Sequence, residues 1–192
     1  MHLLVGLGNP GPQYRSTRHN LGWLVLDAAV AALGAGEWHA EPKHEADMID
    51  YRSSDGGRWL FVKPTTFMNN SGRAVAQLAS FYKVLPGDIV VVHDELDLPF
   101  GTVRTRLGGS AAGHHGIESV AHHLGSDAFW RVRCGIAPRE GTVRQGLGSD
   151  YVLGTFSPDE HAALPAVIEL SSNLVKSAVT SGTLTEVTAT IP

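Results

Sequence analysis

Short runs of apolar residues predict the strands of a sheet. Residues 3–5 and 89–92 consist only of large aliphatic side chains, a pattern typical of strands buried on both faces. Shorter or alternating apolar patterns predict four further strands, at residues 46–51, 58–63, 102–107 and 131–136. Residues 53–57, between the first two of these four, favour a hairpin turn.

Apolar residues spaced three and four apart predict helices over residues 21–33, 75–82, 117–124 and 157–179. Asn20 stands at the N-cap position of the first helix, and Gly34 stands where that helix should stop. The last helix begins at Ser157-Pro158-Asp159-Glu160, which combines a capping box, a proline in the first turn and acidic charge at the positive end of the helix dipole. Polar loops are expected after four of the strands, at residues 9–20, 64–72, 93–99 and 108–116.

Strands and helices alternate along the chain, which favours an α/β fold. We therefore expect residues 1–182 to form a single three-layer α/β/α domain with a twisted, mostly parallel sheet, which the hairpin near residue 55 makes mixed. The threonine-rich residues 183–192 are expected to form a flexible C-terminal tail. In an open sheet of this kind, ligands bind beyond the carboxyl ends of the strands, so the polar loops are the first place to search for a site.

Composition narrows the class of protein. The chain of 192 residues is 43% hydrophobic and 18% charged, like an ordinary globular domain, and it contains no apolar run of about 18 residues that could span a membrane. Its single cysteine, Cys134, lies in an apolar strand pattern and fits a core position in a protein of the reducing cytoplasm. The net charge of −4 argues against bulk attraction to nucleic acid. However, six arginines between residues 104 and 144, against three acidic residues, permit one local site for a polyanion.

Two glycine-rich motifs invite other functions. Gly6, Gly8 and Gly11 spell G-x-G-x-x-G, but nine polar or turn-forming residues separate them from the next helix. A dinucleotide site needs a helix that opens directly on the glycines, so this interpretation is rejected. Ser110 lies in a near match to the nucleophile elbow G-x-S-x-G, in which Ala112 replaces the second glycine. A serine esterase that uses Ser110 therefore stays only as a lesser alternative.

Histidines are frequent, but their spacing does not predict a metal centre. None of the ten belongs to an H-E-x-x-H motif, and we expect the pairs His114-His115 and His122-His123 to lie on the surface without a ligand. His93 directly precedes Asp94, so strand alternation should point it to the opposite side, where we expect a structural role. No metal is expected.

Four polar side chains on three of these loops remain as a candidate catalytic set: His19, Asp94, Asn9 and Asn69. A neutral imidazole has an unperturbed pKa of ~6.5, so it can take a proton from water at neutral pH. A carboxylate that holds its other nitrogen fixes the tautomer and stabilises the imidazolium that forms. Amide side chains can orient the water or donate to a developing oxyanion, although asparagines in such loops could equally well stabilise turns.

At these residues the chain resembles the bacterial-type peptidyl-tRNA hydrolases. Four segments in the order of the family carry the resemblance, namely Val5-Gly6-Leu7-Gly8-Asn9-Pro10-Gly11, Thr17-Arg18-His19-Asn20-Leu21-Gly22, Lys63-Pro64-Thr65-Thr66-Phe67-Met68-Asn69 and His93-Asp94-Glu95-Leu96-Asp97-Leu98-Pro99. Weaker matches continue at residues 104–109, 131–133 and 151–154, so the resemblance spans nearly the whole chain.

The resemblance implies hydrolysis, without a cofactor, of the ester that joins a peptide to the 3′ end of tRNA, by a monomeric cytoplasmic enzyme that recycles tRNA during translation. It implies that His19 activates water, that Asp94 supports His19 and that Asn9 helps to distinguish blocked from free aminoacyl groups. The residues that would line the substrate site are Tyr14, Phe67, Asn69 and His115. The residues that would hold tRNA phosphates are Arg104, Arg106 and Arg133.

One loop departs from the pattern of the family. Where the family usually reads G-G-x-x-G-H-N-G, this chain has histidine at position 115 in place of a substrate-contacting asparagine. Imidazole is larger than an amide and can become charged, which changes substrate positioning and the pH profile. The departure leaves open a second hypothesis, a non-catalytic relative that binds RNA.

Overall fold

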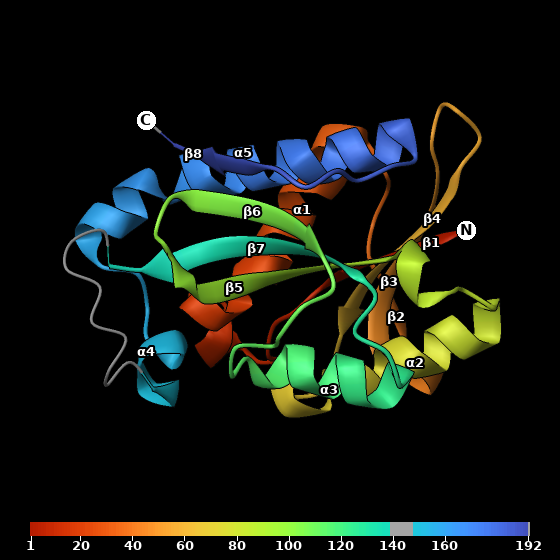
Figure 1. The fold of residues 1–192 in the computed structure, drawn as a ribbon, viewed down its shortest axis with the longest axis horizontal. Coiled ribbons are helices and arrows are strands. Elements are labelled where there is room, and N and C mark those ends of the chain that lie inside the picture. The colour runs from red at the N-terminus through yellow and green to blue at the C-terminus, as the bar shows by residue number, and fades with distance from the viewer. Residues whose placement is uncertain (139–147, 192) are drawn as a thin grey trace.

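The computed structural model describes residues 1–138 and 148–191 (Figure 1). Arg139 and Arg144, two arginines of the basic segment, lie outside the described residues. The strands within those ranges are β1 (His2–Gly6), β2 (His39–Glu41), β3 (Ala46–Arg52), β4 (Arg58–Pro64), β5 (Ile89–Pro99), β6 (Thr102–Leu107), β7 (Trp130–Ala137) and β8 (Thr188–Thr190). The α-helices are α1 (Leu21–Leu33), α2 (Ser71–Tyr82), α3 (His115–Leu124), α4 (Ser149–Leu153) and α5 (Pro158–Ser181).

The strands form one mixed sheet in the order β2-β3-β4-β1-β5-β7-β6-β8. Its centre is parallel, because β1 pairs in parallel with β4 and with β5, and β5 pairs in parallel with β7. The predicted hairpin is present as the antiparallel pair β3–β4. The other edge is antiparallel too, since β6 pairs with β7 and β8. The carboxyl ends of the four central strands therefore meet at one edge of the sheet.

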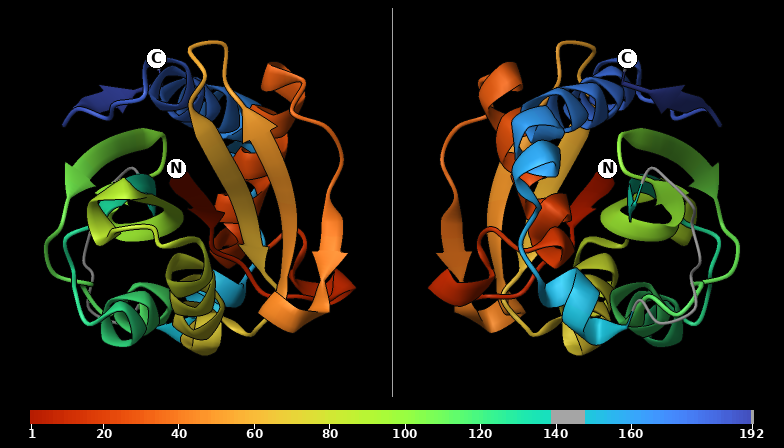
Figure 2. Two further views of the ribbon diagram at one scale, coloured as in Figure 1. Left: turned by 90° about the vertical axis from the view of Figure 1, so that its right-hand side faces the viewer. Right: turned by 90° about the vertical axis from the view of Figure 1, so that its left-hand side faces the viewer.

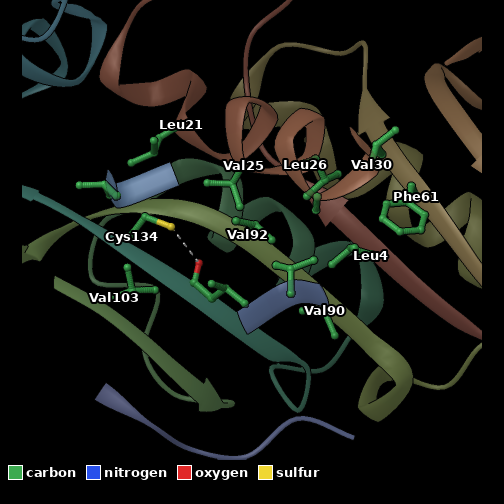
Figure 3. Packing of buried hydrophobic residues seen from close by; sticks show 14 of the residues in the cluster. Leu4, Leu21, Val25, Leu26, Val30, Phe61, Val90, Val92, Val103 and Cys134 are labelled. Atoms are coloured by element: carbon green, nitrogen blue, oxygen red, sulfur yellow. Dashed lines mark hydrogen bonds between the residues drawn. The ribbon is translucent and has the colours of Figure 1, made fainter. Parts of the chain in front are cut away.

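Helices cover both faces, which confirms the three-layer α/β/α prediction (Figures 1 and 2). Helices α1 and α5 pack on one face around a core that includes Leu4, Val92 and Cys134 (Figure 3). Helices α2 and α3 pack on the other face around Leu3, Val91 and Ile117. None of the described helices combines the length and the apolar character needed to cross a membrane.

Strand β5 differs from the prediction of a short strand followed by a polar loop. It continues to Pro99, and its polar part pairs with β7 in the register Asp94 with Cys134 and Glu95 with Gly135. The pairing with a neighbouring strand satisfies the backbone there, so the polar side chains do not end the strand. Asp94 consequently sits on a rigid strand rather than on a loop.

The C-terminal tail differs from the expectation of a flexible segment. Residues Thr188–Thr190 form the edge strand β8 against β6, and the amide of Ile191 donates to the carbonyl oxygen of Gly101 at 3.0 Å. The side chain of Ile191 is buried in the core. Backbone pairing with β6 and this apolar anchor fix a segment whose composition alone indicates disorder.

Candidate functional site

The turn that carries His19 is held directly against the sheet. Arg18–Asn20 form one turn of 3-10 helix just before α1. The second residue of α1 is Gly22, and a Cβ there would lie 2.4 Å from the carbonyl oxygen of Val92 and 2.6 Å from that of Leu7. Only glycine permits this approach, which brings the start of α1 onto β5, two residues before Asp94.

Asp94 lies between two histidines. Nδ1 of His19 is 2.9 Å and 3.0 Å from the two carboxylate oxygens of Asp94, and Nε2 of His114 is 2.9 Å from Oδ1. The exposed fractions of the side chains are 9% for His19, 8% for His114 and 1% for Asp94. The predicted histidine–carboxylate pair is therefore present and nearly excluded from solvent.

The tautomers follow from the remaining hydrogen bonds. The backbone amide of Ile117 donates to Nδ1 of His114 at 3.2 Å, so in the neutral ring the hydrogen is on Nε2, which donates to Asp94. In the same way Nδ1 of His19 donates to the carboxylate, which leaves the lone pair of His19 on Nε2. The nitrogen of His19 that is free to accept a proton is thus the one that points away from Asp94.

Electrostatics keep Asp94 ionised. Burial opposes the charge of the carboxylate and would raise its pKa, but attraction to His19 and His114 and the hydrogen bonds from both rings lower the pKa of Asp94 well below its usual value. The ring of His93, the residue before Asp94, also packs against His114, with centroids 4.8 Å apart. Burial, together with the nearby His114, holds the pKa of His93 well below that of a free imidazole.

The cluster of His19, Asp94 and His114 is also the place where a cation could be considered, since one ligand atom from each lies within 4.8 Å of the others. However, a metal on Nε2 of His114 would have to displace the hydrogen that this nitrogen carries. That proton would move to Nδ1 and face the amide of Ile117. The geometry therefore fits proton handling better than metal binding.

Asn9 presents a defined donor to the same space. Its Oδ1 accepts a hydrogen bond from the amide of Met68 at 2.8 Å, so its amide nitrogen is the polar atom left for a ligand. Asn20 holds the backbone of Asn9 from both sides, because its Oδ1 accepts from the Asn9 amide at 2.9 Å and its Nδ2 donates to the Asn9 carbonyl at 3.0 Å. Asn20 occupies the N-cap position of α1 as predicted, but its side chain fastens this loop instead of capping the helix.

These side chains open on a pocket of about 550 Å³. The predicted residues that line this pocket are Asn9, Tyr14, His19, Phe67, Asn69, Asp94 and His115. The rings of Tyr14 and Phe67 meet edge to face at 6.4 Å, and Phe67 is 55% exposed. Val152 and Leu153 of α4 add apolar surface. The site therefore combines a buried histidine–carboxylate pair with aromatic and amide groups that line the same pocket.

Comparison with known proteins identifies the family. A family model described as peptidyl-tRNA hydrolase matches residues 3–191. The chain belongs to the peptidyl-tRNA hydrolase family. It is 43% identical over 181 residues to the peptidyl-tRNA hydrolase of Geotalea uraniireducens. The matching region covers 94% of this chain and 91% of the relative. It is 45% identical over 174 residues to that of Rhodococcus opacus, with coverage of 91% and 89%.

Solved structures of this family share the fold. A crystal structure of the peptidyl-tRNA hydrolase from Acinetobacter baumannii superposes with a TM-score of 0.84 at 31% identity, over 95% of this chain and 90% of that one. The family resemblance and the α/β fold deduced from the sequence are thereby confirmed. Neither alternative, the non-catalytic RNA-binding relative or the serine esterase, is favoured by these comparisons.

His114 takes part in the candidate site although it was not predicted there, whereas Ser110 stands apart from it. His114, expected on the surface, is the second partner of Asp94, and its burial depends on how α3 meets β5, which no periodicity in the sequence reveals. Its neighbour His115 is exposed at the pocket, with Nδ1 3.3 Å from a carboxylate oxygen of Glu118. Ser110 is exposed, its Oγ accepts from the amide of Ala112 at 3.1 Å, and among the described residues it has no hydrogen bond to a side chain that could act as a base.

The three predicted phosphate-binding arginines lie on the antiparallel part of the sheet. Arg104 of β6 is directly opposite Arg133 of β7. Arg104 and Arg106 are exposed and line a polar recess of about 490 Å³, where Nε of Arg104 donates to the hydroxyl of Thr188 at 3.0 Å. Arg133 is less available, because its Nε donates to a carboxylate oxygen of Glu95 at 2.9 Å and its side chain is 12% exposed.

Proposed function

We propose that this protein hydrolyses the ester bond between a peptide and the 3′ end of tRNA, with His19 as general base. Relatives named peptidyl-tRNA hydrolase align over nearly the whole chain. The observation that carries the mechanism is the contact of Nδ1 of His19 with both oxygens of Asp94 inside the pocket. That contact leaves Nε2 of His19 basic and directed away from its support.

In the proposed reaction His19 takes a proton from water and later gives it to the leaving oxygen. Nε2 of His19 takes a proton from a water molecule as the water oxygen attacks the ester carbonyl carbon, and the carbonyl oxygen becomes an oxyanion. The amide nitrogen of Asn9 donates to this oxygen or to a neighbouring peptide group, since its own Oδ1 is engaged by Met68. The bond to the ribose 3′ oxygen then breaks, and the proton on His19 passes to that oxygen. Asp94 stays ionised and stabilises the imidazolium throughout.

Substrate binding is assigned to two surfaces. Tyr14, Phe67, Asn69 and His115 line the pocket and would contact the terminal nucleotide and the peptide. Arg104 and Arg106 would contact tRNA phosphates, with Arg133 contributing the part of its guanidinium that Glu95 does not engage. Such contacts release counterions, so affinity should fall as salt rises. The change Arg104→Gln should reduce the slope of log affinity against log salt by about 0.7–0.9 for each phosphate that this arginine neutralises.

The test of the reaction uses N-acetyl-aminoacyl-tRNA and unblocked aminoacyl-tRNA as substrates. The wild-type protein should release tRNA from the blocked substrate and leave the unblocked one largely intact, and His19→Ala should abolish turnover. Equal turnover by wild type and His19→Ala would remove His19 from the mechanism. Binding of tRNA without any turnover would instead favour the non-catalytic relative. We also propose that the protein acts in the cytoplasm as a monomer, for which light scattering should give a mass close to 20.5 kDa.

A further inference from the structure

Arg18, the residue directly before His19, is a buried arginine whose side chain reaches from the His19 turn to the far segment of the chain. Its Nη1 donates to the carbonyl oxygen of Thr155 at 2.7 Å, and its Nη2 donates to a carboxylate oxygen of Glu160 at 2.6 Å. Its guanidinium carbon lies 4.2 Å from the centroid of the Tyr151 ring. The side chain is 9% exposed. Such a fork-shaped, stacked contact holds both partners in one geometry, which a lysine could not do.

Backbone contacts strengthen the same junction, by which we mean the contact of the His19 turn with residues 151–160. The amide of Arg18 donates to the carbonyl oxygen of Gly154 at 3.0 Å, and Thr17 forms an isolated antiparallel bridge with Thr155. Glu160 also accepts a hydrogen bond from the backbone amide of Ser157 at 2.7 Å, as part of the capping box of α5. One carboxylate is therefore shared between the start of α5 and the turn that carries His19.

The junction joins two walls of the pocket. His19 lines the pocket from the first segment, and Val152 and Leu153 of α4 line it from the segment that Arg18 grips. Val152 and Leu153 form what we call the α4 wall. A glycine stands at each end of α4, Gly148 before it and Gly154 after it, and glycine restricts the backbone least. The hydrogen bond from Arg18 to the carbonyl oxygen of Thr155, the residue after Gly154, thus limits how far the α4 wall and the imidazole of His19 can move relative to each other.

We propose that Arg18 is a positioning residue for the reaction: it holds the catalytic imidazole of His19 and the α4 wall of the substrate pocket as one rigid unit through Glu160 and the backbone of residues 151–155. The proposal rests on the proposed function, because it concerns the placement of His19 as the base. A buried ion pair is weak evidence for stability, since desolvation cancels much of the attraction. Its value here is geometric, because a reacting group displaced by ~1 Å can cost about 10²-fold in rate.

The experiment compares Arg18→Met, Arg18→Lys and Glu160→Gln with wild type in the blocked aminoacyl-tRNA assay, far below the melting temperature. We expect kcat to fall by about 10-fold to 10²-fold in Arg18→Met, with a smaller fall in Arg18→Lys and the smallest in Glu160→Gln, which keeps an acceptor oxygen. KM should change less than kcat in Arg18→Met, because a displaced imidazole slows the chemical step more than it weakens substrate binding. A purely structural arginine would lower stability and leave both constants unchanged.

Ser157→Ala is the matched control, since it removes the hydroxyl that caps α5 but keeps the side chain of Glu160 and its bond to Arg18. We expect it to lower the melting temperature by about 2–4 °C and to leave kcat unchanged. If Arg18→Met does not fold, Arg18→Lys and Glu160→Gln still decide the question.

The outcomes distinguish the positioning role of Arg18 from the role of His19 as general base. A lower kcat in the Arg18 variants with an unchanged kcat in Ser157→Ala supports the positioning role. Wild-type kcat and KM in folded Arg18→Lys and Glu160→Gln, with His19→Ala inactive, would overturn the positioning role and keep the mechanism. Turnover by His19→Ala would instead overturn the mechanism itself.

Discussion

Replacement of Asp94 by asparagine tests the proton pathway most directly. The carboxylate accepts hydrogen bonds from two N–H groups, on Nδ1 of His19 and on Nε2 of His114. An asparagine offers one acceptor oxygen and one donor nitrogen in the same volume. Because the Ile117 amide fixes the hydrogen of His114 on Nε2, His114 should donate to the side-chain oxygen of the asparagine at position 94. The NH₂ group then faces His19.

A donor in that position reverses the tautomer of His19. Its Nδ1 must accept from the new amide, so its hydrogen moves to Nε2, and the lone pair that should take the proton of water is lost. General base catalysis is worth about 10²-fold to 10⁴-fold, so kcat for the blocked substrate should fall by that factor, or about 3–5 kcal/mol in the activation free energy. KM should change little, because the shape of the pocket is kept.

The second change, His114→Leu in the Asp94→Asn background, sharpens the test. With its competitor gone, the oxygen of the asparagine can turn to accept from Nδ1 of His19, and the productive tautomer becomes accessible again. We therefore expect the double variant to turn over faster than Asp94→Asn alone in single-turnover measurements, with circular dichroism as the control for folding. An Asp94→Asn protein with more than about a tenth of wild-type kcat would refute the role of the carboxylate. A double variant no faster than the single one would refute the assignment of the tautomers.

Three further expectations concern other residues. His93 donates from Nδ1 to the carbonyl oxygen of Asp94 and leaves a buried Nε2 without a partner among the described residues; its lowered pKa means that below pH ~6.5 the unfolded chain takes up a proton that the folded chain does not. The free energy of unfolding should therefore fall as the pH is lowered, with a contribution from His93 that approaches about 1.4 kcal/mol per pH unit. Urea unfolding at several pH values should show that this free energy depends less steeply on pH in His93→Gln than in wild type; an equal dependence in the two proteins would contradict this. Burial raises the pKa of Cys134 to about 12, so iodoacetamide at pH 8 should label only the unfolded protein, and rapid labelling of the native protein would show that the core is open. His115→Asn should leave the free energy of unfolding within ~0.5 kcal/mol because the side chain is 70% exposed. It should also change KM for the blocked substrate, because the side chain of His115 lines the pocket; equal KM values for the two proteins would exclude His115 from substrate binding.

The sequence alone determined the architecture and predicted that His19 and Asp94 lie together. Uninterrupted aliphatic runs such as residues 89–92 identify central strands, because only a strand covered on both faces needs apolar side chains at every position. The capping box at Ser157 and the glycine at position 34 identify helix ends, since these depend on bonds within a few residues. His19 and Asp94 could be paired in advance because parallel strands bring their carboxyl ends to one edge.

Tertiary structure decided what depends on contacts between distant segments. The role of His114 follows from α3 meeting β5, and the sequence around it looks like a surface loop. Asn20 has the pattern of a helix cap, and no local pattern assigns a partner to Arg18, yet each bonds to a segment brought close only by the fold. Strand β8 and the polar end of β5 likewise take their conformation from the strands beside them. Local patterns fix what neighbouring residues satisfy among themselves, whereas buried polar groups take the partners that packing supplies.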